Sequence, residues 1–125
     1  MSILYRKHEK HPKNIYVREF KGEVDVSEII ASWEYLLNNK LITKSTKGII
    51  NDLTECKLTM DMDSFRVLIA YLKGHTEFSK IKLAVICYDP KIIVFPTLGQ
   101  EDVTGLKIRP FTTEEAAVEW IMERS

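Results

Sequence analysis

The sequence predicts an α/β fold: an open mixed sheet in which an N-terminal antiparallel hairpin is followed by βα units whose helices pack on the sheet. Two observations predict it. Short strand-like runs alternate with segments whose apolar residues recur at helical spacing, and Ile81–Tyr88 holds an unbroken apolar run, as in a central strand covered on both faces. Alternating strands and helices favour a parallel sheet with right-handed crossovers, and the opening hairpin adds an antiparallel edge. The predicted order is ββαβαβαβα.

Length and composition suit a single domain over residues 1–125. A chain of 125 residues can bury one core, and 45% apolar with 29% charged residues is the balance of a folded protein. Eighteen basic and eighteen acidic side chains give a formal net charge of zero, which disfavours nucleic acid as a partner. Residues 1–10 contain neither a signal-peptide stretch nor a membrane-spanning segment, so a cytoplasmic protein that does not span a membrane is expected.

The first two strands are predicted at Ser2–Lys7 and Asn14–Phe20, joined by a polar stretch that contains a proline. They form a hairpin that ends at Gly22. The connection carries His8 and His11 within a local basic cluster, which is typical of a solvated hairpin tip. An exposed N-terminal edge strand could also pair with a second copy of the chain, so a homodimer formed by sheet extension is a geometric alternative.

The first helix is predicted over Val26–Asn39. Asp25 and Glu28 approximate a capping box ahead of an apolar stripe at helical spacing. A short strand, Lys47–Asp52, follows, and a loop then leads to the second helix.

The second helix is predicted over Ser64–Lys73, where apolar side chains recur at the i, i+3, i+4, i+7 spacing, and Gly74 closes it. The apolar strand Ile81–Tyr88 comes next. Residues Pro90–Leu98 fit either a short helix or an irregular turn, because a proline at the first position suits a helix start whereas Pro96 disfavours helical geometry at the residue before it.

The last strand is predicted at Leu106–Phe111. Thr112 with Glu115 then forms a T-x-x-E capping box that opens a C-terminal helix. No internal repeat, low-complexity tract or linker interrupts this series of elements.

The sequence offers no catalytic constellation. It lacks the G-x-S-x-G, Gly-rich phosphate-loop, H-E-x-x-H and paired-cysteine motifs, so neither an enzyme nor a cofactor is predicted. Four aspartates near predicted strand ends could together bind a hard cation such as Mg²⁺, but each also suits a cap or a turn, and no metal site is predicted. These are Asp52, Asp61, Asp63 and Asp89. Cys56 and Cys87 are expected to be free thiols.

Four consecutive apolar residues, Ile92, Ile93, Val94 and Phe95, follow the turn at Asp89. A helix with one face on a sheet needs fewer apolar positions, so some of the four are candidates to face a pocket or a partner, although core burial of two or three also explains them. We therefore take Ile92, Ile93 and Phe95 as candidate ligand-binding residues.

Several segments carry a family likeness: the strand KGIINDL, the loop into the second helix, the strand KLAVICY and the closing segment KIRPFTTEEAAVEWI. Through them, nearly the whole chain resembles the STAS domain family, in its prokaryotic branch related to sporulation anti-sigma factor antagonists. The resemblance implies a non-catalytic module that binds a partner protein, with phosphorylation of a serine at the start of the second helix breaking the complex in partner-switching systems. Some relatives in this branch also resemble CRAL-TRIO lipid-binding domains.

An ungapped match of MDMDSFRVLIAYLK to the family's aspartate-serine-serine-glycine stretch places the aspartate on Asp61 and the phosphorylated serine on Asp63. A carboxylate at the N-terminus of a helix is already negative and is stabilised by the helix dipole, so phosphorylation cannot switch this position. Ser64 could take the role if the alignment slips by one residue; otherwise it is a first-turn helix residue.

Two functions follow. The first is a non-enzymatic, STAS-like regulatory module that binds a partner protein through the second helix and the preceding loop, Thr54–Asp63. The alternative is a binder or sensor of a small apolar or amphipathic, lipid-like ligand held between the sheet and Ile92–Phe95. The residues assigned to the partner-binding surface are Thr54, Asp61, Asp63 and Ser64.

Overall fold

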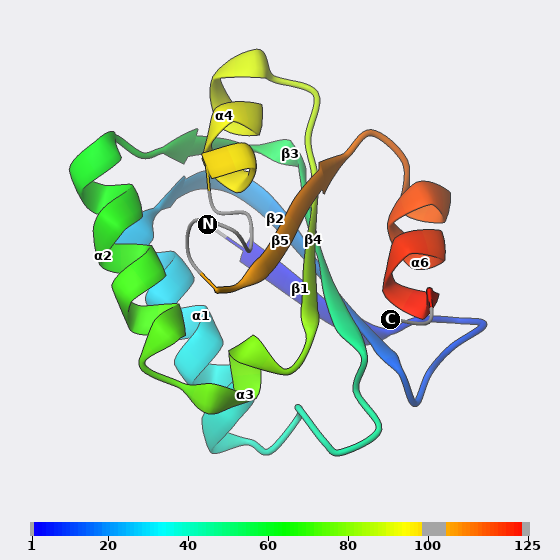
Figure 1. The fold of residues 1–125 in the computed structure, drawn as a ribbon. Coiled ribbons are helices and arrows are strands. Elements are labelled where there is room, and N and C mark those ends of the chain that lie inside the picture. Colours follow the sequence, from blue (N-terminus) through cyan, green and yellow to red (C-terminus); the bar gives the residue numbers. More distant parts are fainter. Residues whose placement is uncertain (1, 99–104, 124–125) are drawn as a thin grey trace.

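The computed structural model describes residues 2–98 and 105–123 and has the predicted α/β architecture (Figure 1). Its strands are β1 (Ser2–Lys7), β2 (Ile15–Asp25), β3 (Gly48–Thr59), β4 (Lys82–Ile86) and β5 (Lys107–Phe111). Its helices are α1 (Val26–Asn38), α2 (Met62–Lys73), α3 (Thr76–Ser79), α4 (Pro90–Leu98) and α6 (Glu114–Met122).

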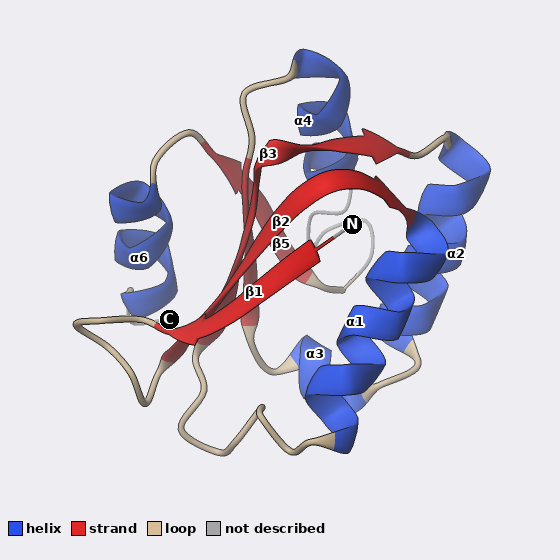
Figure 2. Cartoon of the chain, turned by 180° about the vertical axis from the view of Figure 1, so that it is seen from behind, coloured by secondary structure: helices blue, strands red, loops and turns tan. Residues whose placement is uncertain are grey.

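The five strands form one sheet in the order β1-β2-β3-β4-β5. Strands β1 and β2 are antiparallel, and the other three neighbouring pairs are parallel, so the mixed sheet and the N-terminal hairpin are confirmed. Figure 2 shows β1 on the outer edge of the sheet, where the predicted dimerisation would require it. The dimer itself stays a prediction.

Strand β4 occupies the interior position expected of the apolar run. It is hydrogen-bonded to β3 on one side and to β5 on the other, while β3 is the middle strand of the sheet. Its successive residues Leu83 and Ala84 are both buried, one in each of the two cores described below. An unbroken apolar run is required here because both faces of the strand are covered.

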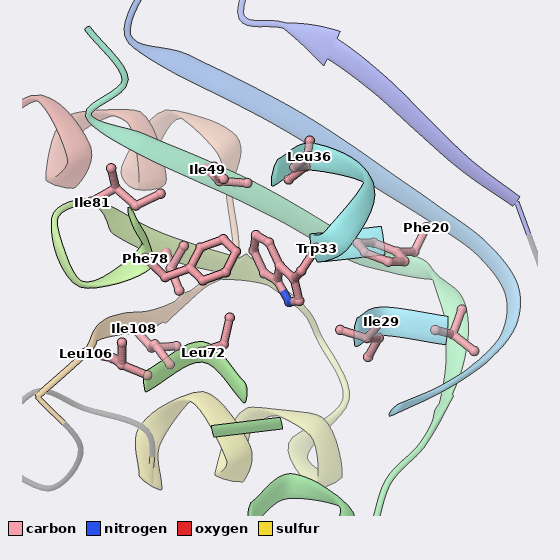
Figure 3. Close-up of a cluster of buried hydrophobic side chains, with 12 residues drawn as sticks. Phe20, Ile29, Trp33, Leu36, Ile49, Leu72, Phe78, Ile81, Leu106 and Ile108 are labelled. Carbon is pink, nitrogen blue, oxygen red and sulfur yellow. The ribbon is translucent and has the colours of Figure 1, made fainter. Parts of the chain in front are cut away.

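Helices cover the two faces of the sheet unequally. Among the described helices, α6 packs on one face, and α1, α2, α3 and α4 gather on the other (Figures 1 and 2). The smaller core, under α6, contains Ile15, Val17, Ile50, Ala84, Ile86, Ala117, Trp120 and Ile121. The larger core includes Phe20, Ile29, Trp33, Leu36, Ile49, Leu72, Phe78, Ile81, Leu83, Leu106 and Ile108, of which Figure 3 labels most.

Strands β2 and β3 are longer than the sequence predicts, and two expectations are corrected. Gly22 does not end the hairpin but lies inside β2, with φ at 85°, opposite Cys56 of β3. The loop expected after Asp52 is instead strand as far as Thr59, and the β2–β3 register shifts between Glu19 and Lys21. Beyond this bulge the backbone N–H and C=O groups of β2 and β3 bond to each other. The residues of neither segment predict this pairing by themselves.

The predicted capping residues are confirmed at α1 and are one residue out at the C-terminal helix. The capping box of Asp25 and Glu28 forms as predicted at α1. Asp61 is the N-cap of α2, which begins at Met62, two residues before the predicted start at Ser64. The C-terminal helix is capped by Thr113, whose hydroxyl accepts from the Ala116 N–H, so the box proposed at Thr112 is one residue out of register.

The structure decides between the two alternatives for α4 and adds a short helix, α3, that the sequence did not predict. Of the two alternatives for Pro90–Leu98, the structure has the helix. The short helix α3, between α2 and β4, was not predicted; it buries Phe78, which packs edge-on against Trp33 with ring centroids 4.9 Å apart. A four-residue helix carries too short a pattern to be recognised in a sequence.

Candidate functional site: a cavity between the sheet and helices α1, α2 and α4

An apolar cavity of about 90 Å³ lies within the larger core. Strands β2 to β5 form its floor, and side chains of α1, α2 and α4 form its walls and roof. The apolar residues that line it include Phe20, Ile29, Trp33, Leu53, Leu58, Phe65, Leu68, Ile69, Leu72, Leu83, Ile92, Phe95 and Ile108. Of the residues assigned to a ligand from the sequence, Ile92 and Phe95 therefore face the cavity, whereas Ile93 is not among its lining residues.

One wall of this apolar cavity carries a buried cation. Arg18 projects from β2 and is only 1% exposed. Its Nε and Nη2 donate to Asn51 Oδ1, at 3.0 and 2.7 Å, and its Nη1 donates to Ser32 Oγ at 2.6 Å. The guanidinium carbon lies 3.7 Å from the Trp33 ring centroid and 4.9 Å from that of Phe20, so the cation contacts two aromatic rings.

The charge of Arg18 has no carboxylate partner among the residues that the structure describes; none of their ion pairs involves it. Burial lowers the pKa of Arg18 to about 9, which still leaves the side chain protonated at neutral pH. Its partner Asn51 is fixed in turn, because Asn51 Nδ2 donates to the Ala84 carbonyl at 3.0 Å and so directs Oδ1 at the guanidinium. The cation is thus held in place by neutral groups only.

A second polar group of the cavity wall has no partner. Trp33 Nε1 is fully buried and makes no hydrogen bond. In Figure 3 the edge of the indole that carries this nitrogen points away from Phe78, toward the space between Leu72 and Ile29, and both of these residues line the cavity. Buried N–H groups are nearly always paired in folded proteins, so this one marks a place where an acceptor is missing.

The cavity adjoins a surface groove of about 480 Å³ between the second half of β3 and α4. The groove and the cavity share Leu53, Leu58, Met60, Ile92 and Phe95. Phe95 of α4 meets Phe65 of α2 across the boundary of the cavity, with ring centroids 5.3 Å apart. Both aromatic side chains line the cavity, and Phe95 also lines the groove.

The partner-binding residues assigned from the sequence separate into two groups. Asp61 Oδ1 accepts from the Ser64 N–H at 2.7 Å, and this bond lowers the pKa of the Asp61 carboxyl. Asp63 points into solvent, 91% exposed, and pairs with Arg66 at 3.2 Å. Ser64 is half-buried within the first turn of α2, as expected.

Thr54 does not join the start of α2. It lies within β3, where its hydroxyl and its N–H both donate to Asp52 Oδ1, at 2.7 and 2.9 Å. The five further residues of extended strand to Thr59 span about 16 Å at 3.3 Å per residue. The interpretation of Thr54–Asp63 as one continuous loop is therefore wrong.

The aspartates considered for a cation serve local structure. Asp52 accepts from Thr54, Asp61 caps α2, and Asp89 Oδ1 accepts from the Lys91 N–H at 2.9 Å at the start of α4. In residues 2–98 and 105–123, no three acidic, histidine or cysteine side chains gather in a metal-binding arrangement. Over the same residues, no helix is long and apolar enough to cross a membrane.

Both cysteines are free thiols, Cys56 half-buried and Cys87 buried. Burial, together with the charge of Asp52, raises the pKa of Cys56 to about 11. Burial likewise raises the pKa of Cys87. Since the thiolate is the reactive form, neither side chain has the properties of a nucleophile at neutral pH.

The connection between β1 and β2 is less solvated than expected. His8 is buried, and its Nδ1 accepts from the backbone N–H groups of Lys10 and His11, at 3.3 and 3.2 Å. Its Nε2 lies 3.8 Å from Glu114 Oε2 at the start of α6. The solvated hairpin tip is therefore wrong for His8, which organises the turn, and this contact with a distant segment has no signal in the local sequence.

The sequence did not identify the polar groups of the cavity wall, which belong to Arg18, Trp33 and Asn51, or Ser32, which accepts a hydrogen bond from Arg18. Arg18 had a signal: in β2 it shares one face with Tyr16 and Phe20, so a charged residue stands at a position where strand alternation requires an apolar one. Ser32 and Asn51 are common types in helices and strands, and only their convergence on Arg18 distinguishes them.

No family model matches the sequence, and no curated protein matches it. Among solved structures, one similar fold is that of an uncharacterised protein of the DUF3478 family, with a SpoIIAA-like fold, from Shewanella loihica. The two are 15% identical, with a TM-score of 0.61 over 96% of this chain and 92% of the other. The anti-sigma factor antagonist SpoIIAA in its unphosphorylated form is 14% identical, with a TM-score of 0.56 over 98% and 100% of the two chains.

A third similar structure is the Bacillus cell fate determinant SpoIIAA in its phosphorylated form, which is 13% identical. Its TM-score is 0.54, over 96% of this chain and 99% of the other. In all three cases nearly the full length of both chains is aligned at low sequence identity. The chain therefore has the SpoIIAA-like, STAS-like fold that its resemblance implied.

Proposed function

Starting from a chain with the SpoIIAA-like fold, we propose that it is a non-enzymatic binding module that holds a small apolar or amphipathic ligand in the cavity between the sheet and helices α1, α2 and α4. The observation that carries this proposal is the apolar cavity itself, which adjoins a surface groove through Ile92 and Phe95. Concave, mostly apolar sites with a few polar groups are the usual form of a small-molecule site.

Binding rather than catalysis fits the chemistry of the site. The polar side chains of the cavity are Arg18 and Asn51. A protonated guanidinium and an amide supply hydrogen bonds, but they form neither an activated nucleophile nor a general base at neutral pH.

Native mass spectrometry of the full chain tests this proposal with two variants of the same helix. Ile69→Phe places a larger side chain toward the cavity, whereas Val67→Phe adds the same ring on the exposed face of α2. We expect a bound small molecule, or binding of added octanoate or octanol, in the wild type and in Val67→Phe, and its loss in Ile69→Phe. Equal binding by all three proteins would show that the cavity is not the site.

The second proposed function is binding of a partner protein through the first turns of α2. The exposed side chains there combine the acidic Asp61 and Asp63 with two apolar residues, Met62 and Val67, which are 42% and 57% exposed. Charge and exposed apolar surface together suit a protein partner with a basic rim and an apolar centre. A similar structure, SpoIIAA, is described as an anti-sigma factor antagonist, which is consistent with this role.

Reversal of one charge tests the partner-binding surface. Asp63→Arg should leave folding intact, because the side chain is exposed and its ion pair with Arg66 is a surface contact of small value. The wild-type chain first captures a partner protein, which is then purified and shown to bind the wild-type chain again. We expect Asp63→Arg not to bind this purified partner. Glu119→Arg, a charge reversal at an exposed position of α6, serves as control. Retention of the partner by Asp63→Arg would exclude this surface.

A further inference from the structure

We infer that the ligand of this cavity carries a carboxylate head group that pairs with Arg18 and accepts the unpaired N–H of Trp33. This inference rests on the proposed ligand-binding function and specifies the chemical class of the ligand. Two independent features of the structure point to it: a buried cation without a counter-ion, and a buried donor without an acceptor.

The groups around Arg18 come from four elements and are all neutral. Asn51 of β3 and Ser32 of α1 accept its hydrogen bonds, Trp33 of α1 and Phe20 of β2 cover its faces, and the Tyr5 phenol of β1 also interacts with it. Neutral partners satisfy N–H groups but do not balance the charge, and buried cations in proteins are normally paired with an anion.

The guanidinium also retains hydrogen-bonding capacity. Arginine has five N–H donors; the hydrogen bonds to Asn51 and Ser32 use one each on Nε, Nη1 and Nη2, and the Tyr5 phenol is a further partner, which leaves one donor. The Trp33 indole, which can only donate, adds one more donor beside the guanidinium stacked on its ring. An ionised carboxylate only accepts, so it matches a site whose free capacity consists of donors.

The dimensions of the site favour a carboxylate with an aliphatic tail. The cavity of about 90 Å³ has room for a planar head group and only a few carbon atoms. Ordinary ligand sites are larger, at about 300–1,000 Å³. The surface groove of about 480 Å³ supplies the remaining space for the tail. The tail then contacts residues that line both the cavity and the groove, including Ile92 and Phe95. A bulkier phosphate head linked to glycerol does not suit so small an interior.

The head group is tested by matched ligands on the full-length wild-type chain. Octanoate, octanol and octyl phosphate share one tail and differ in the head. We expect octanoate to bind about tenfold or more tighter than octanol by calorimetry, as a charge-assisted pair requires, and to raise the melting temperature most. Equal affinities for octanoate and octanol would overturn the carboxylate inference and leave the proposed ligand-binding function intact.

Tighter binding of octyl phosphate than of octanoate would overturn the carboxylate inference and assign the head group to phosphate. Binding of none of the three would overturn both proposals.

Variants then identify the residues that recognise the head. Arg18→Met should abolish the preference for octanoate over octanol while octanol still binds, and Trp33→Phe, which keeps a ring but removes the N–H, should reduce that preference severalfold. Arg109→Met is the matched control, because Arg109 is exposed and stacks on Trp120 beneath α6. Octanol binding by each variant shows that its cavity is intact. An unchanged octanoate preference in Arg18→Met would overturn the role of Arg18.

Discussion

The two faces of the sheet are built from the same strands but differ in how completely they are packed. The core under α6 is apolar and tight: a Cβ atom on Gly48 would lie 2.7 Å from Ile121 and 2.8 Å from the Lys82 carbonyl oxygen. The face under α1, α2 and α4 buries more residues, yet it retains a cavity, the cation of Arg18 and the unpaired Trp33 N–H.

This difference separates the stabilising part of the molecule from the part available for binding. A close-packed apolar face contributes dispersion and hydrophobic energy and leaves nothing for a ligand to satisfy. A face with empty volume and unmatched polar groups gives up some of that energy in the free protein. A ligand that restores the missing contacts can recover it, and stability should then depend on ligand concentration.

The largest loss of stability is expected when a cavity is created in the core under α6. Ile121→Ala removes a side chain that is 2% exposed and in contact distance of the sheet, and we expect it to lower the free energy of unfolding by about 2–5 kcal/mol. Urea denaturation measures this value. Glu119→Ala, exposed on the same helix, is the control and should change stability by less than about 0.5 kcal/mol. A loss below about 1 kcal/mol for Ile121→Ala would mean that this face is not close-packed.

Removal of the buried cation should stabilise the ligand-free protein. Arg18→Met relieves a burial cost of several kcal/mol per ion, against about 1–3 kcal/mol for leaving Asn51 Oδ1 without its donor. We expect a net increase in the free energy of unfolding of about 1–3 kcal/mol by urea denaturation at pH 7. A decrease would show that the aromatic and hydrogen-bond contacts of Arg18 hold the fold together and that the cation needs no ligand.

A ring added to each face should show the difference in packing directly. Ile50→Phe enlarges a side chain that is 0% exposed beneath α6, and overpacking should cost about 1–3 kcal/mol. Leu68→Phe enlarges a cavity-lining residue and should cost less than about 0.5 kcal/mol because empty volume is available. Similar losses of melting temperature in the two variants would contradict the contrast between the faces.

The smallest effect concerns the cap that fixes α6 on the tight face. Thr113→Ala removes the acceptor of the Ala116 N–H, bonded at 3.1 Å, and should cost about 1 kcal/mol. Thr112→Ala, one residue earlier and equally exposed, should be close to neutral by the same thermal or urea measurement. A larger loss from Thr112→Ala than from Thr113→Ala would return the cap to the position first read from the sequence.

The elements that the sequence predicts well have signals confined to a few neighbouring residues. The Asp25–Glu28 capping box and the apolar spacing of α2 are patterns within one or two helical turns, and the apolar run of β4 reports burial on both faces. Features that depend on partners far along the chain were missed or misplaced. The second half of β3 is a strand because β2 pairs with it, and His8 is buried because Glu114 and the turn backbone close over it.

The sequence by itself determined the α/β class and the order of the strands and most helices along the chain, because burial leaves a periodic trace in each segment. Only the tertiary structure decided that Arg18, Asn51 and Trp33 meet at the cavity wall, that Ser32 bonds to Arg18, and that Thr54 lies apart from the start of α2. A hydrogen bond or a charge left without a partner depends on atoms brought together from several elements, and no single segment of a sequence records that convergence.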